Sequence, residues 1–237
     1  MADYPALRAR QDLQDFLDSL WAEGPLRVLD AGCGGAVRVR LPEGAQITGI
    51  DISPESAARN TAIADIIIGD VQTYPLPGQA FDAVICWELL EHVQEPRAAL
   101  TRFVKTLRQG GVIVLAIPNP HSLKGLITRL SPHGLHVWIL RHILKQKNAG
   151  RPGFAPFPTH LSPDIAPPAL ERFFLAHNMS VRFLRLYEGK RLSTLRQHMP
   201  WLYYMYRGCV GALNLVTRRD FGASDMLLVA QAQPRHA

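Results

Sequence analysis

The stretch that decides the fold is Leu26-Arg27-Val28-Leu29-Asp30-Ala31-Gly32-Cys33-Gly34-Gly35, in which a glycine-rich turn directly follows an apolar run. The apolar run reads as a buried strand. A second apolar run, residues 47–51, also ends in an acidic residue. Ligands bind at such strand ends in a parallel α/β sheet, because the glycines let the backbone approach and the second acidic side chain can hold ribose hydroxyls. The pattern therefore predicts a nucleotide-binding edge of a sheet.

Further apolar runs alternate with amphipathic segments along the chain. We expect the remaining strands at residues 66–68, 81–86, 112–117, 181–187 and 225–230. We expect helices at residues 54–64, 88–108, 169–177 and 199–217, with Ser53 as the N-cap of the first and Gly110 at the end of the second. Strands that alternate with helices pair in parallel. The expected fold is α/β: a doubly wound, mostly parallel seven-stranded sheet, Rossmann-like, with a helical cap.

The composition is that of an ordinary globular chain. Its 237 residues are 47% hydrophobic and 19% charged, which excludes collagen, a broadly disordered chain and a coiled coil. Three widely spaced cysteines and an N-terminus without an apolar signal stretch predict a cytoplasmic protein with no disulfide framework.

The net charge of +6 is unevenly distributed. Residues 1–120 hold 10 Lys and Arg against 15 Asp and Glu, a net charge of −5, and residues 121–237 hold 16 against 5, a net charge of +11. A basic half fits an acidic partner or a solvated face equally well.

Two residues indicate which nucleotide fits the first turn. A pyrophosphate binds glycine amides at a helix N-terminus and wants no adjacent carboxylate, yet Asp30 stands directly beside the turn. Position 37, where a dinucleotide fingerprint has its last glycine, is Val37. A cationic amino-acid nucleoside therefore suits this turn better than NAD.

Five motifs in order resemble those of the class I S-adenosylmethionine-dependent methyltransferases. They are Val-Leu-Asp-Ala-Gly-Cys-Gly at residues 28–34, Gly-Ile-Asp-Ile-Ser at 49–53, Gly-Asp-Val at 69–71, Phe-Asp-Ala-Val-Ile-Cys at 81–86 and Leu-Arg-Gln-Gly-Gly at 107–111. The resemblance covers about residues 26–120 well and the remainder loosely. It departs from the family at Ala36, where the family's loop has a glycine, and after Gly35, where the chain is too short for the usual long helix.

The resemblance implies that S-adenosyl-L-methionine is the cofactor and that it is held by Asp30, Ala31, Gly32, Gly34, Asp51, Ile52, Asp70, Val71 and Cys86. By this resemblance the two glycines pass under the methionine part and Asp51 holds the ribose hydroxyls. Ile52 packs on adenine, Asp70 and the Val71 amide meet its edge, and the Cys86 carbonyl faces the amino group. Turn formation after a strand is the alternative role for the two later aspartates.

An acidic and histidine-containing segment, Glu88-Leu89-Leu90-Glu91-His92, follows the fourth strand. On the expected helix, this spacing puts both carboxylates and the imidazole on one face, beside the expected methyl position. With the distant His160, the pattern resembles the metal site of two O-methyltransferase groups: those of ubiquinone biosynthesis, which it matches best, and those that methylate the 3′-terminal 2′-hydroxyl of small RNAs. By that resemblance Glu88, Glu91, His92 and His160 hold a divalent metal such as Mg²⁺ on the acceptor oxygen.

Metal-free roles for the same residues stay open. Glu91 and His92 can form a structural pair, as in many members of the superfamily. His160 and His92 are the candidate catalytic residues, since methylation of a hydroxyl requires its proton to be removed.

The chain is expected to form a single methyltransferase domain, residues 1–237. Its parts are an N-terminal helix at residues 1–25, a cofactor-binding half at 26–118, substrate-cap insertions around the sixth strand at 119–222 and the last strand at 223–232. Residues 199–217 are almost wholly apolar. A membrane span is nevertheless rejected, because the flanking strands belong to one sheet and a polar stripe follows one side of the helix: Arg207, Gly211, Asn214 and Arg218.

The leading interpretation is a cytoplasmic biosynthetic O-methyltransferase that acts on a hydrophobic, anionic or lipid-linked small molecule. Its basic, apolar cap helices suit peripheral contact with an anionic membrane. One alternative is an RNA 2′-O-methyltransferase that uses the basic half as a phosphate groove, but nucleic acid is not expected because no RNA-binding module is recognisable. The other is a non-catalytic cofactor-binding protein. The acceptor, the methylated atom and the oligomeric state stay open.

Overall fold

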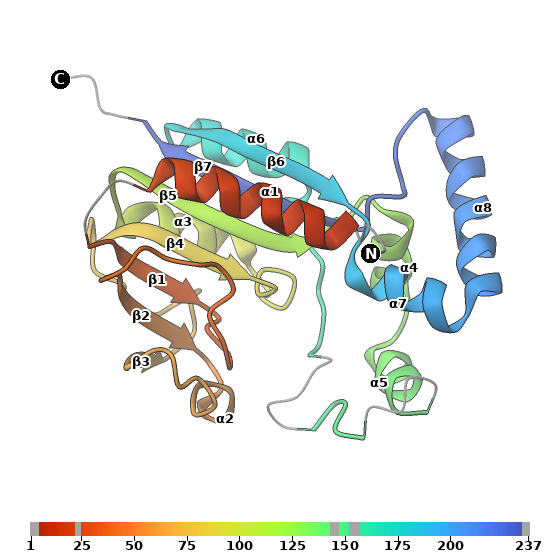
Figure 1. Ribbon diagram of the computed structural model, residues 1–237, viewed down its shortest axis with the longest axis horizontal. Coiled ribbons are helices and arrows are strands. Elements are labelled where there is room, and N and C mark those ends of the chain that lie inside the picture. Colours follow the sequence, from red (N-terminus) through yellow and green to blue (C-terminus); the bar gives the residue numbers. More distant parts are fainter. Residues whose placement is uncertain (1–4, 22–24, 143–146, 152–156, 234–237) are drawn as a thin grey trace.

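The computed structural model describes residues 5–21, 25–142, 147–151 and 157–233 (Figure 1). Its centre is a seven-stranded sheet with the strand order β3-β2-β1-β4-β5-β7-β6. The strands are β1 Arg27–Ala31, β2 Gln46–Asp51, β3 Asp65–Ile68, β4 Phe81–Trp87, β5 Leu107–Pro118, β6 Met179–Tyr187 and β7 Asp225–Ala232. The first five strands pair in parallel, and β7 runs antiparallel to both β5 and β6. The expected doubly wound, mostly parallel sheet is confirmed.

Helices cover both faces of the sheet. They are α1 Pro5–Leu20, α2 Pro54–Ala57, α3 Pro96–Thr106, α4 Leu123–Leu130, α5 His133–His142, α6 Pro167–Ala176, α7 Lys190–His198 and α8 Pro200–Thr217, with a 3₁₀ turn at Pro163–Ile165. Helix α1 lies on one face, and α3 and α6 lie on the other (Figure 1). Successive side chains of β4 point to opposite faces of the sheet. Val84 packs with α3 and α6 on one face, and Ile85 packs with α1 on the other. Strand β4 thus contributes to two apolar layers.

The segment after β4 differs from the expected helix at residues 88–108. Helix α3 begins only at Pro96, and Glu88 has a positive φ of 52°, which no right-handed helix contains. Pro96 also disfavours helical backbone at Glu95. The expected helical start at Glu88 is therefore wrong, and residues 88–94 form turns instead. The expected end at Gly110 is wrong as well, because β5 already pairs with β4 at Leu107.

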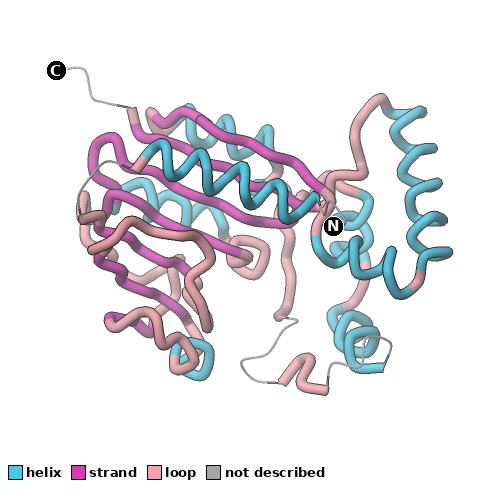
Figure 2. Tube along the Cα trace, in the orientation of Figure 1, coloured by secondary structure: helices cyan, strands magenta, loops and turns pink. Residues whose placement is uncertain are grey.

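The connections around β2 are short. Residues 32–45, all described, contain no helix between β1 and β2, as the chain length predicts (Figure 2). Ser53 caps α2 by accepting a hydrogen bond from the Ser56 amide, as expected, but α2 ends at Ala57 and not at residue 64. Asn60 lies just beyond this turn and donates its side-chain amide to the Cys33 carbonyl at 3.1 Å. The α2 turn thereby braces the glycine-rich turn after β1.

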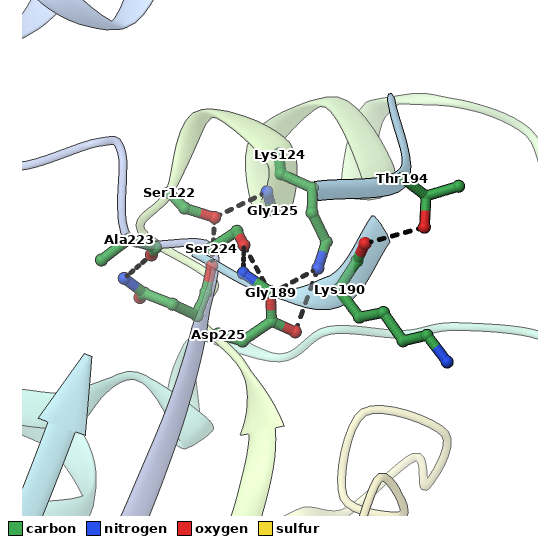
Figure 3. A network of polar contacts seen from close by, with 10 residues as sticks. Ser122, Lys124, Gly125, Gly189, Lys190, Thr194, Ala223, Ser224 and Asp225 are labelled. Carbon is green, nitrogen blue, oxygen red and sulfur yellow. Dashed lines mark hydrogen bonds and ion pairs between the residues drawn. The ribbon is translucent and has the colours of Figure 1, made fainter. Parts of the chain in front are cut away.

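A polar network joins the cap to the sheet (Figure 3). Lys124 of α4 donates to both carboxylate oxygens of Asp225 at the start of β7, at 2.8 and 3.1 Å. The Gly189 amide, just before α7, donates to the Ser224 hydroxyl at 2.9 Å. A Cβ on Gly189 would lie 1.9 Å from an Asp225 carboxylate oxygen, so only glycine lets α7 approach this closely. These contacts hold α4 and α7 beyond the carboxyl end of β5.

Helix α8 occupies the segment whose composition is closest to that of a membrane span. Its start at Pro200 and its end at Thr217 agree with the expected helix at residues 199–217. None of the helices in the described ranges is long and apolar enough to cross a membrane.

Candidate cofactor and acceptor site

A cavity of about 370 Å³ lies at the carboxyl ends of β1, β2 and β3. Five residues of the predicted cofactor set line it: Gly32, Asp51, Ile52, Asp70 and Val71. The same cavity is lined by His92 and His160, the two candidate catalytic residues. One cavity therefore brings together residues expected to hold a nucleoside and residues expected to move a proton.

A buried carboxylate lies in β1, one residue before the strand ends. Asp30 is 2% exposed, and its Oδ2 atom has no hydrogen-bond partner among the described residues. Burial raises the pKa of Asp30 to about 7, and the nearby Asp51 adds to this effect while Arg38 opposes it. A buried carboxylate oxygen without a donor costs free energy, so the site favours a ligand that brings a cation or a donor.

Gly32 is required where the turn meets the cavity. It adopts a positive φ of 71°, and a Cβ at this position would come within 3.1 Å of the Leu89 side chain. Its amide donates to the Ile50 carbonyl at 2.7 Å, which ties the turn to β2. The backbone can therefore border the cavity closely only because the residue is glycine.

Asp51 is held rigidly at the end of β2. One carboxylate oxygen accepts from the Gly34 amide at 3.0 Å and the other accepts from the Ser53 amide at 2.8 Å. Each oxygen keeps a further lone pair for a ligand hydroxyl. Ile52 follows and is 69% exposed, which leaves an apolar surface on the cavity wall without a partner.

Asp70 follows β3 and forms a polar turn with Gln72. Its carboxylate accepts from the Gln72 amide at 2.9 Å and from the Gln72 side chain at 3.0 and 3.1 Å. Turn formation, the alternative role for Asp70, is thus present, and the residue still lines the cavity.

The rest of the predicted cofactor set lies outside the cavity lining. Asp30, Ala31 and Cys86 are buried, Ala31 and Cys86 within paired strands, and Gly34 contacts the site through its amide bond to Asp51. Burial raises the pKa of the Cys86 thiol well above its usual range, so this thiol is not a nucleophile.

The segment Glu88 to His92 does not present its polar groups on one helical face, because it is not helical. Glu88 is exposed and donates its amide to the Ala116 carbonyl at 2.7 Å. Glu91 is buried, and its Oε2 atom has no partner among the described residues. Burial raises the pKa of Glu91 to about 8, with the carboxylate of Glu88 adding to the effect.

The backbone of Glu91 brings the distant histidine to the site. Its carbonyl accepts from the amides of His160 at 2.8 Å and Leu161 at 3.2 Å. Leu161 is fully buried and has a positive φ of 43°, so its packing in the core anchors this contact. The His160 side chain itself is exposed at the cavity.

His92 has a defined orientation. Its Nδ1 atom lies 2.8 Å from the Pro158 carbonyl oxygen, and its Nε2 atom lies 3.9 Å from Glu91 Oε1. A carbonyl oxygen only accepts, so Nδ1 carries the proton and Nε2 keeps a lone pair. Burial, as the largest cause, lowers the pKa of His92, and the positive charge of Arg191 lowers it further. The imidazole is therefore a neutral base with a free Nε2.

The four predicted metal ligands are not assembled into a metal site. Nowhere in the described ranges do three or more His, Cys, Asp or Glu side chains converge as metal ligands, and Glu88, Glu91, His92 and His160 all lie in those ranges. The reason is local: the turn at Glu88 sends its side chain to solvent while Glu91 points inward. As placed, the residues do not fit a metal ion.

Six cavity residues had no predicted role in the site: Ile50, Gly69, Gln72, Leu89, Val93 and Gln94. Ile50 and Gly69 lie inside two of the five sequence motifs, and Gln72 could have been found as the residue that completes an Asp turn after the third strand. Leu89, Val93 and Gln94 were hidden by the incorrect helix over residues 88–95, since turns expose neighbouring positions that a helix separates.

Residues 29–115 match the family of methyltransferase domains. This part of the chain is therefore similar to a methyltransferase domain, as the class I motifs of the sequence predict. Among curated proteins, the chain is 36% identical over 143 residues to the ubiquinone biosynthesis O-methyltransferase of Xanthomonas campestris pv. campestris (strain B100), covering 52% of this chain and 59% of that protein. The corresponding protein of Photorhabdus laumondii is 26% identical over 191 residues, covering 67% and 73%.

A solved structure supports the superfamily fold. The S-adenosylmethionine-dependent methyltransferase of Methanosarcina mazei superposes with a TM-score of 0.54 at 18% identity, covering 92% of this chain and 97% of that one. The chain spans 59% of the length of the curated relative from Xanthomonas campestris, which is less than two thirds. The match to the methyltransferase-domain family ends at residue 115, before the residues expected to form the cap.

Proposed function

We propose that the protein transfers the methyl group of S-adenosyl-L-methionine to a hydroxyl oxygen of a small-molecule acceptor. The observation that carries the proposal is the shared cavity. Asp51 and Asp70 line it, and so do His92 and His160. A methyl transfer from a sulfonium is an in-line displacement, so the enzyme must mainly align two molecules and accept one proton.

The residues present fit this cofactor. The buried Asp30 Oδ2 atom without a partner suits the cationic amino-acid end, and the exposed Ile52 suits an aromatic base. Asp51, fixed by two backbone amides, keeps lone pairs for ribose hydroxyls. Asp70 and the Val71 amide would meet the adenine edge, Gly32 and Gly34 would border the methionine part, and Ala31 and Cys86 would contribute backbone. When bound, the sulfonium supplies an electrophilic methyl group.

His92 is the base in this proposal. Its Nδ1 proton is directed to the Pro158 carbonyl, and its lowered pKa keeps Nε2 unprotonated near neutral pH. The acceptor oxygen forms the new bond to the methyl carbon as the carbon–sulfur bond breaks, and its proton passes to Nε2. His160, exposed at the same cavity, would bind the acceptor or share this role.

Metal assistance, for example by Mg²⁺, stays a prediction of the sequence pattern. As the described residues are arranged, they do not assemble a ligand set. In the proposed reaction, His92 alone accepts the proton of the acceptor hydroxyl.

We further propose a hydrophobic or lipid-linked acceptor related to ubiquinone precursors. This assignment is supported by the names of the relatives at modest identity and by the apolar, basic character of residues 119–222, proposed as the acceptor cap. It includes peripheral contact of an otherwise cytoplasmic protein with an anionic membrane.

Calorimetry with S-adenosylhomocysteine, followed by a methyl-transfer assay with catechol acceptors, tests the proposal. We expect binding that an Asp51→Ala change weakens at least about tenfold, because charge-assisted hydrogen bonds contribute about 1.5–3 kcal/mol each. A His92→Gln variant should retain binding and lose turnover. Absence of nucleoside binding would overturn the assignment, and full activity of His92→Gln would overturn the role of the base.

A further inference from the structure

Helix α8 exposes an apolar face to solvent, unlike a typical surface helix of a globular protein. Of its 18 residues, all described, Tyr203 and Val210 are buried. At about 100° per residue, these two project from one side of the helix. The exposed large apolar residues project from the other side: Trp201, Tyr204, Met205, Leu215 and Val216. A surface helix ordinarily turns its apolar stripe to the core and its polar side to water, whereas α8 turns an apolar face to solvent.

This apolar face, defined by those five residues, is continuous, and the described residues leave it uncovered. Its members fall within an arc of about 120° around the helix. Leu215 and Val216 are 83% and 82% exposed. A Cβ added to Gly208 or Gly211 would meet no atom within 4 Å, so the described part of the chain leaves open space beside the helix.

The polar stripe of α8 explains the orientation. Arg207 reaches Glu188 at 3.8 Å, and the side-chain oxygen Oδ1 of Asn214 accepts from the Phe221 amide at 2.9 Å. Arg218 ends the helix in the left-handed conformation. The stripe that the sequence places in water is therefore used to attach the helix and its following loop to the protein, and the apolar face is left outside.

The charges around α8 point to an anionic occupant. Residues 190–219 contain six Lys and Arg and no Asp or Glu: Lys190, Arg191, Arg196, Arg207, Arg218 and Arg219. Two acidic residues border this segment, but Glu188 is paired with Arg207 and Asp220 accepts from the Gly222 amide. A second copy of α8 would cover the apolar face without bringing an acidic residue to Arg218 and Arg219, because α8 contains none. An anionic lipid surface complements both the apolar face and its flanking cations.

We propose that the apolar face of α8 docks on an anionic lipid bilayer. Trp201 and Tyr204 lie at the start of the helix, where their amphipathic rings suit the headgroup boundary, and Arg218 and Arg219 lie at the other end. Helix α8 packs on α7, whose first turn contains Arg191, the charge that acts on His92. Docking would thus bring the acceptor side of the site to the membrane. This consequence rests on the proposed function, but the surface itself does not.

Flotation of the full chain with vesicles tests the surface. The probes are phosphatidylcholine alone and phosphatidylcholine with phosphatidylglycerol. We expect binding to the anionic vesicles that weakens as salt rises, and a loss of at least about tenfold in partitioning for a Leu215→Ser, Val216→Ser double variant. The matched control replaces two exposed leucines elsewhere, Leu7→Ser and Leu175→Ser, which are 63% and 76% exposed on α1 and α6.

Three results would overturn the inference. They are no vesicle binding by the unmodified chain, equal losses in the α8 variant and its control, and a concentration-dependent dimer in light scattering that the α8 variant abolishes while vesicle binding is absent. Because all replaced side chains are exposed, the variants should keep their fold, which circular dichroism checks. Binding of S-adenosylhomocysteine is measured in parallel, so a failed cofactor assignment is distinguishable from a failed docking surface.

Discussion

Replacement of Asp30 by asparagine should stabilise the protein while it weakens cofactor binding. The side chain is buried, and its Oδ2 atom has no partner among the described residues. Asparagine has almost the same shape and carries no charge, so the Asp30→Asn change removes the cost of burying an ionised carboxylate. It also removes the negative charge that we assign to the cationic end of S-adenosylmethionine.

The size of the stabilisation follows from the raised pKa. The folded pKa of Asp30 lies at about 7, above the ordinary value of 3.8, so the folded state holds the proton more tightly than the unfolded chain does. Protonated Asp30 therefore contributes to the free energy of unfolding. This contribution is fully present below pH 3.8 and is lost as the pH rises to about 7. At about 1.4 kcal/mol per unit, the loss reaches about 4 kcal/mol.

Urea unfolding at a series of pH values measures this effect as the difference between variant and unmodified protein. The difference should be near zero at about pH 4, grow to about 4 kcal/mol near pH 7 and then level off. Calorimetry should show at least about tenfold weaker binding of S-adenosylhomocysteine by the variant. A difference that does not change with pH would refute the reasoning about burial, and unchanged binding would refute the role in the cofactor site.

Three further changes probe the base, the cap and the metal. Arg191→Gln removes a positive charge that lowers the pKa of His92, so an NMR titration should show this pKa higher and the acid limb of the activity profile should move to higher pH. Gly189→Ala places a Cβ against Asp225 and should cost about 2 kcal/mol or more in urea unfolding, whereas Gly208→Ala in open space on α8 should stabilise by about 0.5–1 kcal/mol. Methyl transfer that depends on His92 alone should survive exhaustive chelation, since the described residues do not assemble a ligand cluster; a loss restored by Mg²⁺ would instead support the metal assistance that the sequence pattern predicts.

The fold of residues 26–118 could be predicted because its signals are local. The turn after β1, the acidic ends of β2 and β3 and the apolar runs between them each depend on a few neighbouring residues. Parallel pairing then brings the strand ends to one edge. The two helix errors at residues 58–64 and 88–95 arose because helical periodicity was extended past the point where the backbone turns.

The chemical site was less predictable because its geometry depends on contacts between distant segments. Pairing of Glu88 with Ala116 and of Glu91 with His160 joins the turn to β5 and to the cap, and neither contact has a sequence signature. His160 and His92, which the sequence pattern groups together, both line one cavity, and their roles stay predictions. It could not show that a left-handed residue at Glu88 separates the two carboxylates.

The two buried carboxyl groups and the apolar face of α8 have a common physical meaning. Asp30 and Glu91 each carry a buried oxygen atom without a partner among the described residues, and both pKa values are raised because burial disfavours the charge. An unsatisfied acceptor inside and an uncovered apolar surface outside are both unfavourable for the chain alone. Such features persist where something other than the chain completes them. Under the two proposals, a small cationic ligand completes the polar groups at the edge of the sheet, and a lipid surface covers the apolar face of α8.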